Sequence, residues 1–393
     1  ITILYIPKSM QYIGNYSFAN STINKVIFFT GSDLKGIGDY AFYNCYNLFE
    51  INLAVCTSLT YMGSYAFANT SSLYSNGALI LPASLSDMGE GAFERSGVER
   101  VNFVNGSKLR VLPKKVFYEC SNLLSIIFNG SSALTTIGEN AFYNCNNLSI
   151  FRNVNAIIET IEAGAFKACG NLYTLDINSS RLKDIGSEAF EDMGYVNSRN
   201  ENLVTVGNIL IKYKGTETVV TIPNTITSIY DGAFEGNNKI TTIIFAANSK
   251  IVTINDNVFK DCINLENINF PNTITRVGND VVTNTLWYQN AIRSGVEYIT
   301  IGNTLIKYNG TARQVVIPKY VHIINKDAFA GVELHNIQIG EQVTLINDGA
   351  FNGIIIPQVT YEKGRYLYVE CIDDGEFSIQ LGNSKDNYGS NSL

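Results

Sequence analysis

Two patterns of apolar and polar positions alternate along the chain with a period of about 24 residues. The first is Leu-x-x-Ile-x-Ile, whose alternating end is typical of a half-buried strand. The second is Ile-Gly-x-x-Ala-Phe-x-x-Cys, as at Ile137–Cys145, where apolar residues three to four apart predict a single turn of helix or 3₁₀ helix. The strand pattern recurs at Leu48–Leu53, Val98–Phe103, Leu123–Phe128, Leu172–Ile177 and Leu265–Phe270. Each repeat is therefore predicted to be one coil, with a strand on one side and a short turn, the arm, on the other.

The phenylalanine that usually follows alanine in the arm is the most regular position of the repeat. It is found at Phe18, Phe42, Phe67, Phe93, Phe117, Phe142, Phe166, Phe190, Phe234, Phe259, Phe329 and Phe351. A fixed period of 20 to 29 residues is the signature of a solenoid, in which each coil buries its apolar face only against its neighbours. The stacked rings would form a continuous aromatic spine. The pattern predicts an elongated repeat protein rather than a globular enzyme.

The period is interrupted twice, after Phe190 and after Phe259. The nearly identical segments Val206–Thr216 and Ile301–Thr311 lie in the interruptions and indicate a duplication. Asn309-Gly310 favours a type I′ turn between two apolar runs. We expect hairpin-like coils without phenylalanine near residues 199–223 and 294–318.

We expect residues 1–357 to form one solenoid domain. In residues 358–393, two segments at 366–370 and 376–381 predict a β-hairpin that either caps the solenoid or begins the next module, followed by a disordered tail. The chain begins within a strand pattern, although the first coil of a solenoid needs a cap. We therefore expect an excerpt or processed form, with any signal peptide upstream.

Charged residues make up only 16% of the chain, against roughly 25% in ordinary soluble domains, whereas 46% of the residues are hydrophobic. The formal net charge is −7, and lysine and arginine form no cluster. The electrostatic footprint of a nucleic-acid-binding protein is missing, so neither nucleic acid nor an anionic membrane is an expected partner. Membrane insertion is not expected either, because the sequence has no run of about 18 apolar residues.

Candidate catalytic and metal-binding chemistry is sparse. His322 and His335 are the two histidines, and neither belongs to a metal-binding spacing. We find no phosphate-binding loop, nucleophile elbow or calcium loop. Asp373, Asp374 and Glu376 allow a glycosidase or calcium interpretation, but Asp-Asp-Gly is more typical of a solvated turn. We predict no catalytic, cofactor-binding or metal-binding site and no enzymatic activity.

Most cysteines share one repeat position, three residues after the phenylalanine. They are Cys45, Cys120, Cys145, Cys169 and Cys262. Coils stacked roughly 5 Å apart would bring successive cysteines within disulfide range. Other coils place Ser96 or Met193 at this position, which favours a small buried side chain that lines a tight turn.

The combined motif, Leu-x-x-Ile-x-Ile-Pro followed by Val-x-x-Ile-Gly-x-x-Ala-Phe-x-x-Cys, resembles the BspA-like (Treponema pallidum-type) leucine-rich repeat of bacterial and some protozoan surface proteins. The resemblance covers residues 1–357 and is clearest at Leu34–Leu53, Leu134–Leu148 and Leu182–Phe190. It implies a right-handed leucine-rich-repeat horseshoe or superhelix with a parallel β-sheet on its concave face. It also implies a secreted or cell-surface protein that adheres to host matrix proteins or epithelia.

Exposed positions between the repeat-defining residues are the candidates for ligand contact. On the strand side we expect protein contact at Lys25, Glu50, Asn52, Arg100, Asn102, Arg152, Tyr173, Asp176, Glu266, Asn269 and Gln338. On the arm side, Tyr40, Tyr43 and Tyr143 either contact a glycan or protein or pack between arms. The preferred interpretation is adhesion or protein–protein interaction by a monomer, with a surface or matrix protein of the host or of a neighbouring cell, or with a glycan, as the partner. A carbohydrate-recognition module of a larger secreted enzyme and a structural stalk are the alternatives.

Overall fold

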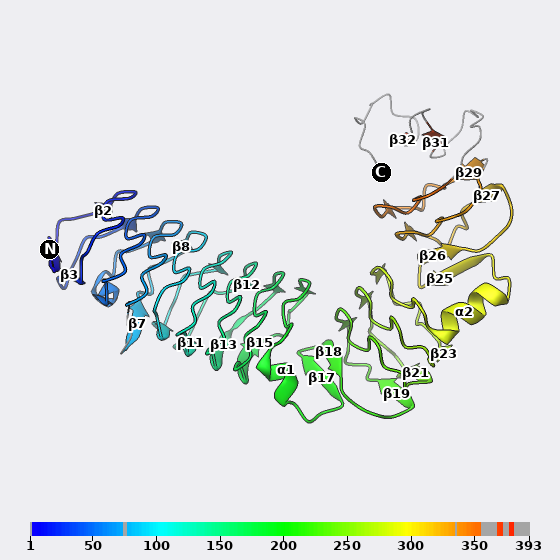
Figure 1. Cartoon of the computed structure of the whole chain (residues 1–393), viewed down its shortest axis with the longest axis horizontal. Helices are drawn as coiled ribbons and strands as arrows, with labels where there is room; N and C mark the ends of the chain where they lie inside the picture. Colours follow the sequence, from blue (N-terminus) through cyan, green and yellow to red (C-terminus); the bar gives the residue numbers. More distant parts are fainter. Residues whose placement is uncertain (1, 74–76, 335, 355–367, 372–376, 381–393) are drawn as a thin grey trace. The chain divides into compact units, whose positions relative to one another are not determined.

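The computed structural model describes residues 2–73, 77–334, 336–354, 368–371 and 377–380. The chain divides into two compact units, residues 1–208 (unit 1) and 209–393 (unit 2), and each is described by itself. In both units the chain winds as a parallel β-solenoid in which a typical coil contributes one longer and one shorter strand (Figure 1). The predicted repeat solenoid of the leucine-rich-repeat type is confirmed.

In unit 1 the strands stack as parallel sheets in chain order, and short helical elements lie outside the sheets. The longer strands are β1 (Ile3–Ile6), β3 (Lys25–Phe28) and β5 (Glu50–Ile51) in one sheet, and β7 (Ala78–Leu81), β9 (Arg100–Phe103), β11 (Ser125–Phe128), β13 (Ile150–Ile157) and β15 (Thr174–Asn178) in another. The shorter strands are β2 (Tyr12–Ile13), β4 (Gly36–Ile37), β6 (Tyr61–Met62) and β8 (Asp87–Met88), then β10 (Val111–Leu112), β12 (Thr136–Ile137), β14 (Thr160–Ile161) and β16 (Asp184–Ile185). Unit 1 also contains the 3₁₀ helix η1 (Leu53–Val55), helix α1 (Gly194–Ser198) and β17 (Leu203–Val206).

Unit 2 repeats this arrangement with an eight-residue helix, α2 (Leu286–Arg293), between its coils. Its strands are β18 (Ile209–Tyr213), β20 (Ser228–Ile229), β22 (Thr253–Ile254) and β24 (Arg276–Val277); β19 (Val219–Ile222), β21 (Thr242–Phe245) and β23 (Asn267–Ile268); β25 (Tyr298–Ile301), β26 (Thr304–Tyr308), β28 (Ile323–Ile324) and β30 (Leu345–Ile346); and β27 (Gln314–Val316) and β29 (Asn336–Gln338). β31 (Tyr368–Cys371) and β32 (Phe377–Gln380) pair antiparallel. Asp373, Asp374, Glu376, His335 and the tail expected to be disordered lie outside the described residues.

The longer strands pair in register, so equivalent residues of successive repeats lie side by side. In β9, Val101 and Phe103 are buried, whereas Arg100 and Asn102 face outward. Arg100 is the register partner of Ser125 in β11. The alternation with a period of two therefore gives the sheet one buried and one outward face, as predicted.

The stacked phenylalanine rings form the predicted aromatic spine. In unit 1 the ring centroids of Phe42 and Phe67 lie 5.1 Å apart, and those of Phe67 and Phe93 lie 5.3 Å apart, with the rings nearly parallel. The stack continues through Phe117, Phe142, Phe166 and Phe190. The spine is confirmed as core packing, because these rings are fully or almost fully buried.

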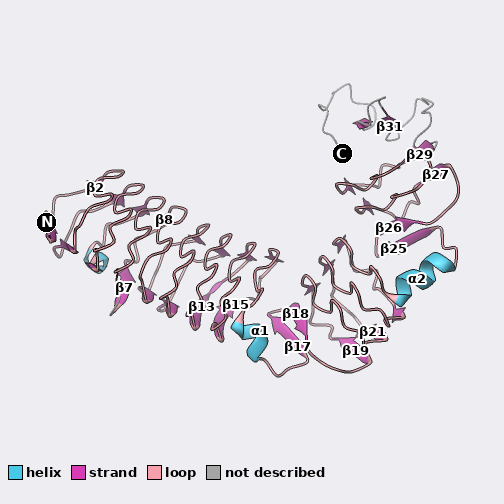
Figure 2. Cartoon of the chain, viewed as in Figure 1, coloured by secondary structure: helices cyan, strands magenta, loops and turns pink. Residues whose placement is uncertain are grey.

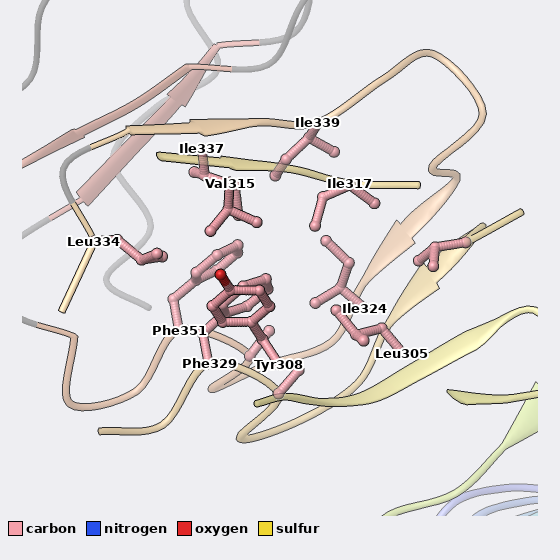
Figure 3. Close-up of a cluster of buried hydrophobic side chains, with 13 residues drawn as sticks. Leu305, Tyr308, Val315, Ile317, Ile324, Phe329, Leu334, Ile337, Ile339 and Phe351 are labelled. Carbon is pink, nitrogen blue, oxygen red and sulfur yellow. The ribbon is translucent and has the colours of Figure 1, made fainter. Parts of the chain in front are cut away.

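In unit 2 a tyrosine takes the spine position where phenylalanine is missing. The ring of Tyr308 stacks on Phe329 at 5.5 Å, and Phe329 stacks on Phe351 at 5.0 Å, inside the apolar cluster of Figure 3. Tyr213 stacks on Phe234 at 5.1 Å. The hydroxyl of Tyr308 donates to a main-chain carbonyl at 3.2 Å, so its buried polar group is satisfied. The coils without phenylalanine thus keep an aromatic ring in the spine, which the search for phenylalanine alone missed.

The second of these coils contains an antiparallel hairpin of β25 and β26. Its turn is Gly302-Asn303, and Gly302 has a φ of 56°. Glycine at the first position of a two-residue loop is typical of a type II′ turn. The turn expected at Asn309-Gly310 is wrong: the Asn309 side chain donates instead to the carbonyl of Ile292 near the end of α2, at 2.9 Å.

The arms consist of hydrogen-bonded turns in place of the expected helical turn (Figure 2). In the arm of Phe42, the amide of Cys45 donates to the Phe42 carbonyl within the coil at 3.2 Å. The amide of Phe42 donates instead to the carbonyl of Ala66 in the next coil, at 2.8 Å. A helix would use its amides internally. The alternation of turns leaves every second amide free to join successive coils.

The arms typically contain two residues in the left-handed conformation. In the arm of Phe42 they are Tyr40, with a φ of 55°, and Asn44, with a φ of 58°. Each occupies the third position of a type II turn, which requires a positive φ. At the position of Asn44, another coil carries Ala168, also with a φ of 58°. This conformation costs an L-residue about 1 to 2 kcal/mol, and asparagine tolerates it better than alanine.

Replacement of Ala168 by glycine should stabilise the protein by about 1 kcal/mol, because glycine adopts a positive φ without steric cost. Urea denaturation followed by circular dichroism measures the effect. The matched control is Ala165→Gly, which removes a fully buried methyl group from the same arm at a residue without a positive φ, and should destabilise. A lower midpoint for Ala168→Gly would contradict the expectation.

In several coils the close approach of the preceding coil leaves room only for glycine after the shorter strand. A β-carbon added to Gly63 would lie 2.4 Å from the amide nitrogen of Asp39 in the preceding coil. One added to Gly89 would lie 2.3 Å from the amide nitrogen of Ser64. Both glycines lack a positive φ. In these two coils the corner therefore has no room for a side chain, whereas Glu162 and Asn255 occupy the equivalent position in other coils.

The cysteines of the repeat are free, buried thiols that bond to the preceding coil. The Cys145 thiol donates to the carbonyl of Phe117 at 3.0 Å, and the Cys169 thiol donates to the carbonyl of Phe142 at 3.1 Å. Burial raises the pKa of Cys120 and of Cys169 from an ordinary value of 9.0 to about 12. The expected role as a small side chain lining a tight turn is confirmed.

These thiols should make the protein less stable in alkali. The folded protein binds the thiol protons of Cys120 and Cys169 more tightly than the unfolded chain does, so their contribution is complete below pH 9 and is lost as the pH rises towards 12. The loss should be on the order of 1 kcal/mol per thiol for each pH unit in that range. Urea midpoints at pH 8 and pH 10.5 measure it. The double variant Cys120→Ala, Cys169→Ala should lose less stability between these two pH values; an equal loss would contradict the assignment.

Asn153 is a polar residue in an apolar column of the core. It is 0% exposed, and its side-chain amide has no hydrogen-bond partner among the described residues. It pairs in register with Ile177, and the same column contains Phe103 and Phe128 of earlier coils. A buried amide without a partner is destabilising.

Asn153→Leu should therefore raise the free energy of unfolding by about 1 to 2 kcal/mol. The control, Asn102→Leu, changes the same residue type on the outward face of β9 and should leave stability nearly unchanged. Both are measured by urea denaturation. Destabilisation by Asn153→Leu would mean that the amide has a stabilising role.

Candidate functional site

The outward residues of the longer strands of unit 1, here called the strand face, form the first candidate surface. Register places Ile80, Asn102, Ile127, Arg152 and Asp176 in one row across β7 to β15. Neighbouring strands lie roughly 4.8 Å apart. The hydrogen-bonded sheet therefore holds apolar and polar side chains in a fixed row.

The charged candidates on the strand face all form ion pairs. Lys25 Nζ lies 2.7 Å from Glu50 Oε2, and Arg152 Nε lies 2.9 Å from Asp176 Oδ2. Arg100 contacts a neighbouring glutamate at 3.3 Å. These pairs are partly exposed, so each contributes at most about 1 kcal/mol to stability. Their larger effect is that the strand face carries no charge field of a single sign.

Asn52 and Tyr173 differ in how available their side chains are for contact with another protein. The Asn52 side chain accepts from the amide of Phe28 at 2.7 Å and donates to the carbonyl of Phe28 at 2.8 Å, which extends the hydrogen bonding of β3. Tyr173 is 52% exposed and bonds only to the Asn171 side chain, at 3.2 Å, among the described contacts. Asn52 thus stabilises the sheet, whereas Tyr173 is available for contact.

The predicted strand-side residues do not gather in one place. Arg100, Asn102, Arg152 and Asp176 belong to the β7–β15 sheet, with Tyr173 directly before β15, whereas Lys25 and Glu50 belong to the β1–β5 sheet. In unit 2, Glu266 and Asn269 flank β23, and Gln338 ends β29.

The predicted tyrosines belong to two stacks on the arms of unit 1. Tyr40 stacks between Tyr16 and Tyr65, with centroid distances of 4.8 and 5.1 Å, and Tyr43 meets it edge-on at 5.3 Å. Burial and a hydrogen bond to Glu90 raise the pKa of Tyr65 to about 12.

The second stack pairs Tyr143 with Tyr118, with ring centroids 4.9 Å apart. The cationic groups of Arg95 and Lys115 lie 5.8 and 5.7 Å from the centroid of the Tyr118 ring. Tyr143 therefore lies in a different cluster from Tyr40 and Tyr43. Packing between arms accounts for much of each cluster.

In unit 2 the residues around β21 and β23 line an open pocket of about 440 Å³. It contains Glu266 and Asn269, which were predicted, and Trp287, which was not. Trp287 is the single tryptophan of the chain and lies in the second interruption of the period. This position in the sequence could have indicated the site, because a large aromatic residue outside the repeat pattern does not belong to the spine.

Within the described part of the chain, no group of three or more His, Cys, Asp and Glu side chains could hold a metal ion. His322 is exposed, as expected of a rim position. The described residues contain no helix that is both long and apolar enough to cross a membrane.

The coil geometry and the repeat define a leucine-rich-repeat protein. The family model described as BspA type leucine rich repeat region matches residues 1–109, 102–208, 212–309 and 299–381. The chain belongs to this family, as the resemblance of its motif indicated. Curated proteins give no match to the sequence.

Three bacterial leucine-rich-repeat structures are among the solved structures that this chain resembles. A leucine-rich repeat protein from Bacteroides ovatus is 16% identical, with 91% of this chain and 92% of that chain covered and a TM-score of 0.46. A leucine rich cell surface protein from Faecalibacterium prausnitzii is 20% identical, with 93% and 89% covered and a TM-score of 0.36. The leucine rich repeat protein of T. pallidum is 20% identical, with 49% and 77% covered and a TM-score of 0.34.

Proposed function

We propose that this chain is a non-catalytic, extracellular or cell-surface protein that mediates adhesion or protein–protein interaction, with host matrix or epithelial proteins as its partners. The observation that carries the proposal is the fixed row on the strand face of unit 1, from Ile80 to Asp176. Membership of the BspA-type family supports a surface location.

The composition of the strand face suits a protein partner. Ile80 is 39% exposed and Tyr173 is 52% exposed, so apolar surface is available for burial. Tyrosine and arginine are enriched among residues that carry binding energy at protein interfaces. The Arg152–Asp176 pair lies beside this apolar surface and carries no net charge. A partner therefore gains affinity by covering apolar and aromatic groups rather than by steering from a distance.

Binding of the purified chain to immobilised matrix proteins and epithelial cell layers tests the proposal. The double variant Arg152→Ala, Tyr173→Ala should weaken binding at least about tenfold, because it removes one residue of the row and the exposed tyrosine directly before β15. The matched control is Lys183→Ala, which removes a 71% exposed partner of another ion pair, with Glu159, outside the strand face. Antibody labelling of intact cells tests the location.

Failure to bind across a broad panel of matrix and epithelial proteins would refute adhesion. Equal binding by the double variant and the native chain would show that the interface lies elsewhere than on this face.

A further inference from the structure

The pocket of unit 2 lies where the regular stacking of coils stops. The strands β19, β21 and β23 form a three-stranded sheet within the described residues. α2 follows in the chain where the next coil would add a strand, and it lies beside β23 (Figure 1). The amide of Trp287 donates to the carbonyl of Leu265 at 2.8 Å, just before β23. Trp287, at the start of the helix, thus lines the open pocket beside the sheet.

Trp287 is held in a defined position at this pocket. The side chain of Thr285 caps the helix by accepting from the amide of Tyr288 at 3.1 Å. The indole meets the ring of Phe270 edge-on, with a centroid distance of 5.4 Å. Trp287 is only half-buried, so part of the indole remains open to the pocket. The structure therefore presents an aromatic surface that is already ordered.

The polar lining of the pocket is free of internal partners. The side chains of Thr242, Glu266, Asn267 and Asn269 line it and make no hydrogen bond or ion pair with any described residue. Together they offer a hydroxyl, a carboxylate and two carboxamides, which include both donors and acceptors. Lysine and arginine are absent from the described lining.

This combination matches the chemistry of a sugar ring better than that of other ligands. The hydroxyl groups of a pyranose both donate and accept, as carboxamides and carboxylates require, and its C–H face packs against an aromatic ring. An anionic ligand would meet the Glu266 carboxylate without a cation to offset it. A single carboxylate among four polar groups gives little preference for a cationic peptide. An added peptide strand would need the edge that Trp287 already contacts through Leu265.

We propose that the pocket formed by β21, β23 and α2 binds one pyranose unit of a neutral glycan. In this site the exposed part of the Trp287 indole packs against the sugar ring. Asn269, Glu266 and Asn267 bond to its hydroxyl groups. The volume of about 440 Å³ lies within the range of small-molecule sites. The site lies in unit 2 and does not depend on the strand face of unit 1.

The single tryptophan makes the site directly observable. A glycan array identifies neutral oligosaccharides that the purified full chain retains, and each is then titrated while the fluorescence of Trp287 is recorded. The expected result is a saturable change in intensity or wavelength with at least one neutral oligosaccharide. Asn269→Ala and Glu266→Gln should each weaken that affinity about five- to tenfold, because each removes or weakens a hydrogen bond.

The matched controls are Tyr173→Ala and Arg152→Ala. These residues occupy the repeat positions of Glu266 and Asn269 in unit 1, and their replacement should leave the titration unchanged. Trp287→Phe should retain part of the affinity, whereas Trp287→Ala should lose most of it; affinity is then measured by calorimetry, with circular dichroism to check folding. Loss of binding in the Asn269 and Glu266 variants, with the controls unaffected, supports the proposal.

The proposal is overturned if no neutral glycan binds, if binding survives Asn269→Ala and Glu266→Gln, or if Tyr173→Ala abolishes it. The adhesion assay separates this result from the proposed function, because the Arg152→Ala, Tyr173→Ala variant affects only the protein-binding face. Glycan binding without protein adhesion, and the reverse, are therefore distinguishable outcomes.

Discussion

The structure depends on the spacing between successive coils, which the backbone hydrogen bonds set. The strands of successive coils bond to each other as in any parallel sheet, and the arms do the same through every second amide, as from Phe42 to Ala66 at 2.8 Å. The spine ring of Phe42 then lies 5.1 Å from the next one, which is close to the strand spacing of roughly 4.8 Å. Aromatic stacking and the backbone hydrogen bonds between coils are thus both satisfied by the same distance between successive coils.

Other residues of the repeat are consequences of this spacing. In several coils glycine follows the shorter strand because a β-carbon there would meet the backbone of the preceding coil, at 2.4 Å in the case of Gly63. The next residue bridges the same coils from its side chain: Asp39 Oδ1 accepts from the amide of Ser64 at 2.8 Å. The buried cysteine makes a further contact between coils, since the Cys145 thiol donates to the carbonyl of Phe117 in the preceding coil. A small donor suits this position because the coils leave little space between them.

The sequence predicted these features to different degrees. The strand register and the spine were predictable because they follow from apolar periodicity, which encodes burial. The arm was not, because apolar residues three to four apart fit a helical turn as well as two successive type II turns. The left-handed residues that distinguish the two are mostly Asn, Asp or Gly at the position of Ala168, as at Asn44 and Asn144, and this pattern lies outside the apolar periodicity on which the prediction was based. Tyr308 was missed as a spine residue because only phenylalanine was sought and tyrosine carries a polar hydroxyl group. The ring of Tyr308 nevertheless stacks on Phe329 in the core.

Binding surfaces are harder to predict because the constraint that fixes the fold leaves outward positions free. Arg152 and Asn269 occupy the same repeat position, yet one forms an ion pair on an open sheet and the other lines a pocket. Sequence position alone could not separate them, since the difference arises from α2, which replaces a strand beside β23. Where coils stack regularly, a solenoid presents a continuous strand face, suited to a broad protein contact. A pocket forms only where another element stands beside the strand face, and such an element, like α2, interrupts the repeat. The interruptions of the period are therefore the places where this fold can acquire a site for a small ligand.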